Sequence, residues 1–262
     1  MQKFLIKCLL SCLAVFIGME SSGSASEYST FFLPGSTLVY RHWNLKKNKI
    51  TGYSRLSYRR VMEPGNEFLV ETHEDSKPNG KVFLRKKLWF ELKTGQPVRY
   101  FQEDLRKNWS IENHYKLDAV KSKLSKNGKM IEIDQPLEKN TVPFELLTFY
   151  LRRQYAEHQF ARDQKFLLYL PATKFESEML SATWDFSAVK EKELELETPF
   201  GMVSAAQILV TTTSDFLKWL LPQSKTNFRF FIEQQMPHHI LAFEEHETRF
   251  ILENLENGSD TP

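Results

Sequence analysis

Apolar and polar residues alternate along most of this chain, and this alternation limits the possible folds more than any other feature of the sequence. The clearest run lies between residues 81 and 93. Its apolar face consists of Val82, Leu84, Leu88, Phe90 and Leu92. A period of two places one face of a strand in a core and the other in water. Similar runs recur from residue 38 to residue 255, separated by turns, so the sequence predicts a mainly β protein.

One segment has the period of a helix instead. Phe144, Leu147 and Leu151 fall at i, i+3 and i+7 and therefore share one helix face. Neighbouring leucine and aromatic residues widen that face to more than half of the helix surface. Thr141 is placed to cap the first turn, and Pro143 is tolerated within it. We therefore expect the main helix of the protein in this segment.

A helix this apolar must be covered, and only a sheet is available here to cover it. We expect a single strongly curved antiparallel sheet, a half-barrel, wrapped around one main α-helix at about residues 141–158. The sheet and the helix together form one domain, residues 26–256, followed by a polar tail at residues 257–262. No repeat of fixed period and no linker composition divides this domain.

Residues 1–25 have the features of a secretory signal peptide. Lys3 and Lys7 supply a positive start, an apolar run follows from residue 9 to residue 19, and small residues precede a cleavage position near Ala25. The apolar run is too short for a comfortable membrane span of about 20 residues. We therefore expect a periplasmic or secreted protein.

Both cysteines of the chain, Cys8 and Cys12, lie inside this predicted signal. A lipid attached at Cys12 and an uncleaved anchor are the alternatives to cleavage near Ala25. Cleavage removes every thiol, which excludes disulfides and thiolate metal ligands. The formal net charge of +2 is too small to indicate a nucleic-acid partner. No segment of the mature chain is apolar and long enough to predict a transmembrane span.

The order of these features resembles a known family. After the β-meander come a helix ending in Tyr150-Leu151-Arg152, the run Thr-Pro-Phe-Gly-Met-Val-Ser-Ala at residues 198–205, and an aromatic strand at Trp219. This order resembles the exported bacterial proteins called domain of unknown function 3108, whose architecture is similar to the half-barrel lipoprotein carriers LolA and LolB. The family helix usually opens with Asp-Pro and a Ser two places on, whereas residues 141–145 read Thr-Val-Pro-Phe-Glu, so the chain resembles a divergent member. The resemblance implies a location in the periplasm and a cupped sheet. It assigns no catalytic residue to this chain.

Seven histidines invite a search for metal or catalytic groups. The densest cluster, His238-His239, is expected at a solvated strand end, where adjacent side chains point to opposite faces and cannot easily share one ion. His42 and His73 belong to a scattered remainder. The chain has no HExxH motif, no Gly-x-Ser-x-Gly elbow and no glycine-rich phosphate loop. We therefore predict no catalytic residue, no metal site and no cofactor.

The leading hypothesis is a non-enzymatic exported protein that binds or chaperones an apolar ligand, such as a lipid or acyl chain, in the cupped sheet. Trp184, in an irregular segment at residues 172–187, would form part of a lid. The other expected ligand-binding residues are Phe144, Leu147, Tyr150 and Leu151, all on the helix. One alternative is an envelope-assembly or scaffold protein with a filled core and an envelope protein as its partner. A hydrolase is a further alternative, which no motif favours.

Overall fold

The computed structural model describes residues 34–256 apart from residues 95, 117, 139 and 171–181. The predicted signal peptide (1–25) and polar tail (257–262) lie outside the described residues. Within them, fifteen strands form one continuous sheet. The first eight strands are β1 (Thr37–Asn44), β2 (Lys49–Glu63), β3 (Asn66–Ser76), β4 (Val82–Glu91), β5 (Pro97–Asp104), β6 (Trp109–Tyr115), β7 (Ala119–Lys126) and β8 (Lys129–Pro136). The remaining seven are β9 (Thr141–Pro143), β10 (Gln164–Leu170), β11 (Ala182–Thr198), β12 (Gly201–Thr212), β13 (Asn227–Glu233), β14 (Ile240–Glu245) and β15 (Thr248–Glu256).

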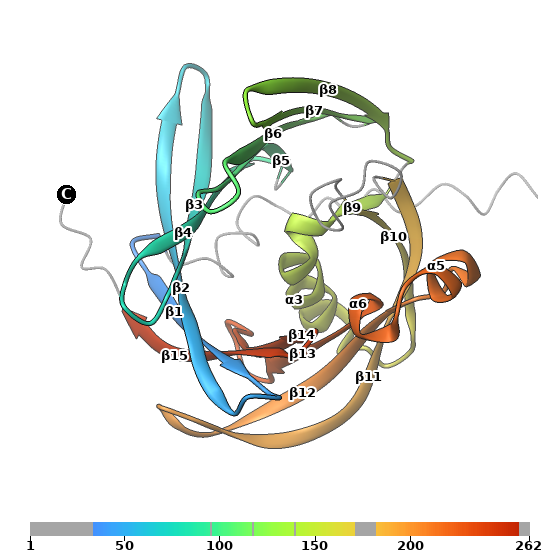
Figure 1. The fold of residues 1–262 in the computed structure, drawn as a ribbon. Coiled ribbons are helices and arrows are strands. Elements are labelled where there is room, and N and C mark those ends of the chain that lie inside the picture. Colours follow the sequence, from blue (N-terminus) through green and yellow to red (C-terminus); the bar gives the residue numbers. More distant parts are fainter. Residues whose placement is uncertain (1–33, 95, 117, 139, 171–181, 257–262) are drawn as a thin grey trace, which may run out of the picture.

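The sheet is assembled from two meanders that meet in its middle. Its strand order is β8-β7-β6-β5-β4-β3-β2-β1-β15-β14-β13-β12-β11-β10-β9, so β1 pairs with β15 at the centre while β8 and β9 form the edges. Figure 1 shows the sheet curling around a helix, α3 (Leu147–His158). The predicted fold class, a mainly β protein with one strongly curved sheet around one main helix, is confirmed. The described strands depart from a wholly antiparallel sheet only where β9 runs parallel to β10.

The main helix begins later than the sequence predicted. Residues Thr141–Pro143 form β9, and a 3₁₀ turn, η1 (Phe144–Leu146), leads into α3. Pro143 has φ −62° and ψ 142°, which is extended backbone, and no side chain caps the turn that follows. Thr141 is therefore a strand residue rather than a helix cap, because β9 gains hydrogen bonds by pairing with β10. The helix ends at His158, as expected, where Gln159 adopts a left-handed φ of 49°.

Helix α3 packs against both halves of the sheet. Leu147, Leu151 and Tyr155 are buried among side chains of β10 to β13. Phe149 is buried on another face of the helix, among side chains of β1 to β5 that include Leu88. Burial of each such leucine contributes about 1.5–3 kcal/mol. The helix therefore ties the two meanders together across the inside of the curve.

Two aromatic segments differ from the sequence prediction. The strand expected at Trp219 is instead a short helix, α5 (Asp215–Leu220), followed by α6 (Gln223–Thr226). The Ser214 side chain accepts a hydrogen bond from the N–H of Leu217, and such a cap favours a helix start. Trp184 lies in strand β11, paired with β10, rather than in an irregular segment. Among the described residues, the helices are all too short or too polar to cross a membrane.

Candidate functional site

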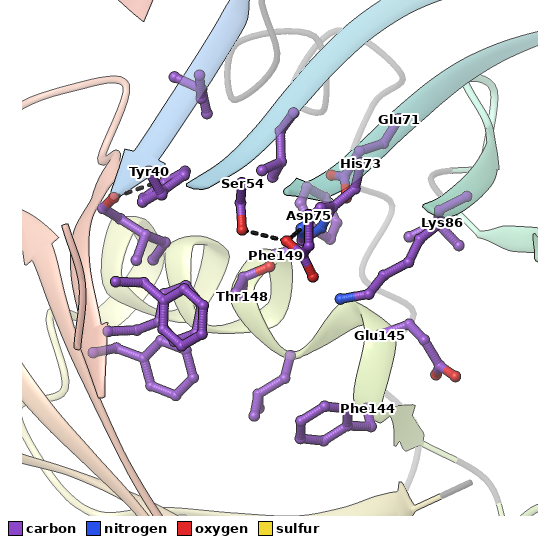
Figure 2. Close-up of a pocket in the computed structure, with 18 of the residues that line it drawn as sticks. Tyr40, Ser54, Glu71, His73, Asp75, Lys86, Phe144, Glu145, Thr148 and Phe149 are labelled. Carbon is purple, nitrogen blue, oxygen red and sulfur yellow. Dashed lines mark hydrogen bonds and ion pairs between the residues drawn. The ribbon is translucent and has the colours of Figure 1, made fainter. Parts of the chain in front are cut away.

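A cavity of about 390 Å³ lies between the concave face of the sheet and α3 (Figure 2). Three groups of elements build its wall: strands β1 to β5, the turn η1 with the first half of α3, and strands β13 to β15. Because side chains alternate between the two faces of each strand, every second residue of these strands points inward. The cavity is therefore lined by residues that the strand register brings together from distant parts of the chain.

The wall formed by β2 to β5 carries a band of polar side chains. In the register of these strands, Ser54 lies opposite Asp75, and His73 lies opposite Lys86. Lys86 in turn lies opposite Gln102. Cross-strand partners on one face sit close enough to interact directly. The band is therefore continuous across four strands. Its inward neighbours on β2 and β4, such as Leu56 and Leu88, are apolar, whereas β3 also carries Glu71.

Asp75 is the centre of a buried hydrogen-bonded group. Its Oδ1 accepts a hydrogen bond from Nε2 of His73 at 2.7 Å and another from the hydroxyl of Ser54. Burial alone would raise the pKa of Asp75, but the charges of His73 and Lys86, together with these two hydrogen bonds, hold that pKa well below its usual range. Asp75 is therefore an ionised carboxylate at neutral pH.

His42 stands behind Ser54, with 2.5 Å between its Nε2 and the Ser54 hydroxyl oxygen. Burial lowers the pKa of His42 to about 4, and the charges of His73 and Lys86 lower it further against the opposing effect of Asp75. His42 is therefore neutral at neutral pH. Because the single hydroxyl proton of Ser54 goes to Asp75, Nε2 of His42 must be the donor in its own bond to Ser54.

A second polar group lies deeper along the helix. Arg152 is a buried cation whose Nη2 donates a hydrogen bond to the backbone carbonyl of Pro237 at 2.9 Å. Burial lowers the pKa of Arg152, while the nearby Tyr58, Tyr40 and Glu71 raise it. Burial also raises the pKa of Glu71, and the charges of His73, Lys86 and Arg152 oppose that rise, as does a hydrogen bond with Tyr58. The charges of this group are thus compensated within the protein.

The opposite wall of the cavity is aromatic. Phe230 pairs across strands with Phe243, and Phe243 pairs with Phe250. The Phe243 and Phe250 rings are stacked, with centroids 4.1 Å apart and planes inclined by 5°. Phe228 extends this wall to Phe144 of η1, with ring centroids 5.8 Å apart. Stacked and tilted ring pairs of this kind form a stable apolar surface. This surface borders the cavity, and Phe228 and Phe230 are also buried in the core beside α3.

Among the described side chains, the polar band is not arranged as a hydrolase triad. In such a triad an imidazole stands between the serine and the carboxylate, so that it can take the serine proton. Here the Ser54 hydroxyl donates directly to the Asp75 carboxylate, which stands between Ser54 and His73, while His42 donates to the Ser54 oxygen instead of accepting from it. No group of three or more metal-binding side chains occurs within the described residues. The cavity has one polar wall and one aromatic wall.

The structure separates the five residues that the sequence proposed for ligand binding. Phe144 and Leu147 line the cavity. Leu151 is fully buried in the core between α3 and β10 to β13, and Tyr150 packs on Phe166 with ring centroids 4.8 Å apart. Trp184 stacks on Phe216 of α5, at 5.7 Å and 12°. Whether these residues contact a ligand stays a prediction, but only the first two border the cavity.

Sequence reasoning missed the polar band, although one signal was present. Lys86 occupies an inward position of the 81–93 run, between Leu84 and Leu88, where a charged side chain is unexpected on an apolar face. His238 was also misplaced at a solvated strand end. Its side chain is 8% exposed and packs on Tyr155, with ring centroids 5.3 Å apart.

No family model and no curated protein matches this chain, so the resemblance to domain of unknown function 3108 is not confirmed. A β-barrel-like protein of the domain of unknown function DUF1849 from Brucella abortus has a similar fold, at 11% identity and a TM-score of 0.43, over 86% of this chain and 98% of its own. A candidate lipoprotein from Parabacteroides distasonis is similar at 11% identity and 0.38, over 87% and 98%. A candidate exported protein with a YmcC-like fold from Bacteroides fragilis is similar at 10% identity and 0.37, over 87% and 99%. Similarities at this level carry no argument about function.

Proposed function

We propose that this chain is an exported, non-enzymatic protein that binds a lipid or acyl chain in the cavity between the concave sheet and α3. The cavity carries the proposal. Its volume of about 390 Å³ lies near the lower end of the range of about 300–1,000 Å³ that is typical of small-molecule sites. A cavity of this size favours a ligand with a single chain over a lipid with several chains.

The chemistry of the wall supports the same ligand class. The aromatic wall of Phe228, Phe230, Phe243 and Phe250 offers an apolar surface to a hydrocarbon chain. The polar band on β2 to β5 would leave buried hydrogen-bonding groups beside an entirely apolar ligand, which is unfavourable. A molecule with an apolar tail and a polar head satisfies both walls. Export is proposed from the signal features of residues 1–25.

The rival proposal is a scaffold protein of the cell envelope that holds no ligand. It would be favoured by a core filled with side chains, whereas the space beside α3 is open. A hydrolase gains no support from the polar band, because the Ser54 proton is held by Asp75 rather than by a histidine base.

Purification of the mature protein, followed by solvent extraction and mass spectrometry, tests the proposal. We expect a single-chain lipid to be recovered, and we expect the emptied protein to take up a hydrophobic fluorescent dye. Thr148 lines the cavity and is exposed to it, so Thr148→Trp fills that space without entering the core. This variant is expected to lose dye uptake.

Ala156→Trp is the matched control, because Ala156 is exposed on the same helix and does not line the cavity. It is expected to retain the dye uptake of the wild-type protein, and circular dichroism checks that both variants keep their β content. The proposal fails if the wild-type protein carries no lipid and takes up no dye. It also fails if Thr148→Trp and Ala156→Trp take up dye equally. Recovery of a stoichiometric envelope protein with an empty cavity would favour the scaffold.

A further inference from the structure

Lys86 is a cation of the cavity wall whose amine is not in contact with an acidic or hydrogen-bonding group of any described side chain. Lys86 lines the cavity from β4, and Figure 2 shows its side chain reaching inward toward the helix. Within the described part of the chain its amine makes no hydrogen bond and no ion pair. Lys86 is half-buried between Leu84 and Leu88 on the cavity wall, and a charge pair in such a partly shielded place is stronger than one in open water.

Four acids line the same cavity as Lys86, namely Glu71, Asp75, Glu145 and Glu245, and the charge of Lys86 lowers the pKa of the first two. Asp75 accepts hydrogen bonds from His73 and Ser54 on one oxygen. Glu71 makes a hydrogen bond with Tyr58, and the charges of His73, Lys86 and Arg152 act on it as well. These two acids stabilise the Lys86 charge only from a distance. Among the described residues no acceptor contacts the amine directly, and the cavity has space beside Lys86 for one.

Gln102 places a second donor beside Lys86. The two residues are direct cross-strand partners on β4 and β5, and both line the cavity. The carbonyl oxygen of the Gln102 side chain accepts a hydrogen bond from the Tyr100 hydroxyl at 2.5 Å. With that oxygen engaged, the Gln102 side chain offers its N–H groups as the remaining functional atoms. An ammonium group and an amide N–H side by side are a combination that binds an oxyanion.

We propose that Lys86 and Gln102 bind the anionic head of a single-chain ligand, a carboxylate or a phosphate, whose tail lies against the aromatic wall. This inference rests on the proposed function and adds the chemical class of the head group. The ligand is then an anionic amphiphile, oriented with its head at β4 and β5 and its tail at Phe230, Phe243 and Phe250.

Three ligands with the same twelve-carbon tail test the head group on the wild-type protein. Dodecanoate and dodecyl phosphate carry the two anionic heads, and 1-dodecanol carries a neutral one. Dissociation constants are measured at pH 7 by displacement of the fluorescent dye. At least one of the two anions should bind about ten- to a hundred-fold more tightly than the alcohol. This is the range expected for one charge-assisted hydrogen bond. The anion that binds more tightly identifies the head group as carboxylate or phosphate.

Lys86→Met removes the charge and keeps most of the side-chain stem. It is expected to weaken binding of the preferred anion about ten-fold or more and to leave binding of 1-dodecanol unchanged, while Lys86→Arg restores anion binding. Lys87→Met is the control, because Lys87 is the exposed neighbour on the same strand. Gln102→Leu provides an independent variant, with a smaller loss for the anion alone. Thermal unfolding confirms that each variant is folded.

Equal binding of the anions and the alcohol by the wild-type protein would overturn the head-group assignment and leave the proposed function standing. A Lys86→Met protein that loses anion and alcohol equally, or loses neither, would also overturn it. Failure of the wild-type protein to bind any of the three ligands would instead count against the proposed function itself.

Discussion

Acid should destabilise this protein through His42 before it acts on the carboxylates. The His42 side chain is 8% exposed, and burial is the main cause of the fall in its pKa from 6.5 to about 4. The nearby Asp75 charge raises the pKa, and the charges of His73 and Lys86 lower it. These groups surround the imidazole from β3 and β4. The folded state therefore favours neutral His42.

The sign of the effect follows from proton binding. Above pH 6.5 His42 is neutral in both states, so its contribution to the free energy of unfolding is constant. Between pH 6.5 and about 4 the unfolded chain binds a proton that the folded protein does not, so stability falls as the pH falls. One pKa unit corresponds to 1.36 kcal/mol, which gives a loss of about 3 kcal/mol across this window. Asp75, whose pKa is depressed, adds its own loss only as the pH falls below its unfolded value of about 3.9.

Urea unfolding followed by tryptophan fluorescence at pH 7, 6, 5 and 4 measures this loss. His42→Gln keeps a donor for Ser54 and cannot titrate, so its free energy of unfolding should fall about 3 kcal/mol less than that of the wild-type protein. His114→Gln is the control, because the His114 side chain is 49% exposed on β6. Parallel pH profiles for His42→Gln and the wild-type protein would refute the reasoning.

Three further changes test the packing. Leu151→Ala removes a fully buried side chain and should lower the free energy of unfolding by about 2–5 kcal/mol in urea, whereas Met62→Ala, at a residue 75% exposed, should change it by under about 0.5 kcal/mol. Arg152→Met should lower the free energy of unfolding by about 1–3 kcal/mol, because it removes the hydrogen bond to Pro237 and one of the charges that act on the buried Glu71. Adding Glu71→Gln should recover part of that loss, and no recovery would show that the two charges act independently. Gly52→Ala places a Cβ against a backbone carbonyl of β3 and should lower the midpoint temperature of thermal unfolding. An unchanged midpoint would show that β3 moves to make room for the added Cβ.

The strands and the main helix could be predicted because their signals are local. The apolar–polar alternation at residues 81–93 lies within one strand. The helical spacing of Phe144, Leu147 and Leu151 likewise lies within one short segment of the chain. The start of the helix could not be placed, because the backbone before Phe144 is extended and pairs with β10, a partner more than twenty residues away. Trp219 was assigned to a strand because its aromatic neighbours outweighed the Ser214 cap.

The polar band could not be derived from the sequence, because only the pairing register of the strands brings its residues together. His42, Ser54 and Asp75 have no common motif. Ser54 pairs directly with Asp75 on β3, and His42, whose direct partner on β2 is Gly52, reaches Ser54 diagonally. A shift of one residue in any of these strands would turn its side chains to the other face. Of the helix residues that line the cavity, the sequence proposed Phe144 and Leu147 for ligand binding, while Thr148 and Arg152 were not among the proposed ligand-binding residues.

The pairing of the first strand with the last has a consequence for biogenesis. Thr37 lies beside Glu256, so the seam between the two meanders joins residues more than two hundred positions apart. Contacts of such long range form slowly, because the entropy cost of closing a large loop comes before any stabilisation from the contacts. Phe250 of the cavity wall belongs to that last strand. During synthesis from the amino end, the wall of the cavity therefore stays incomplete until β15 has been made and has paired with β1.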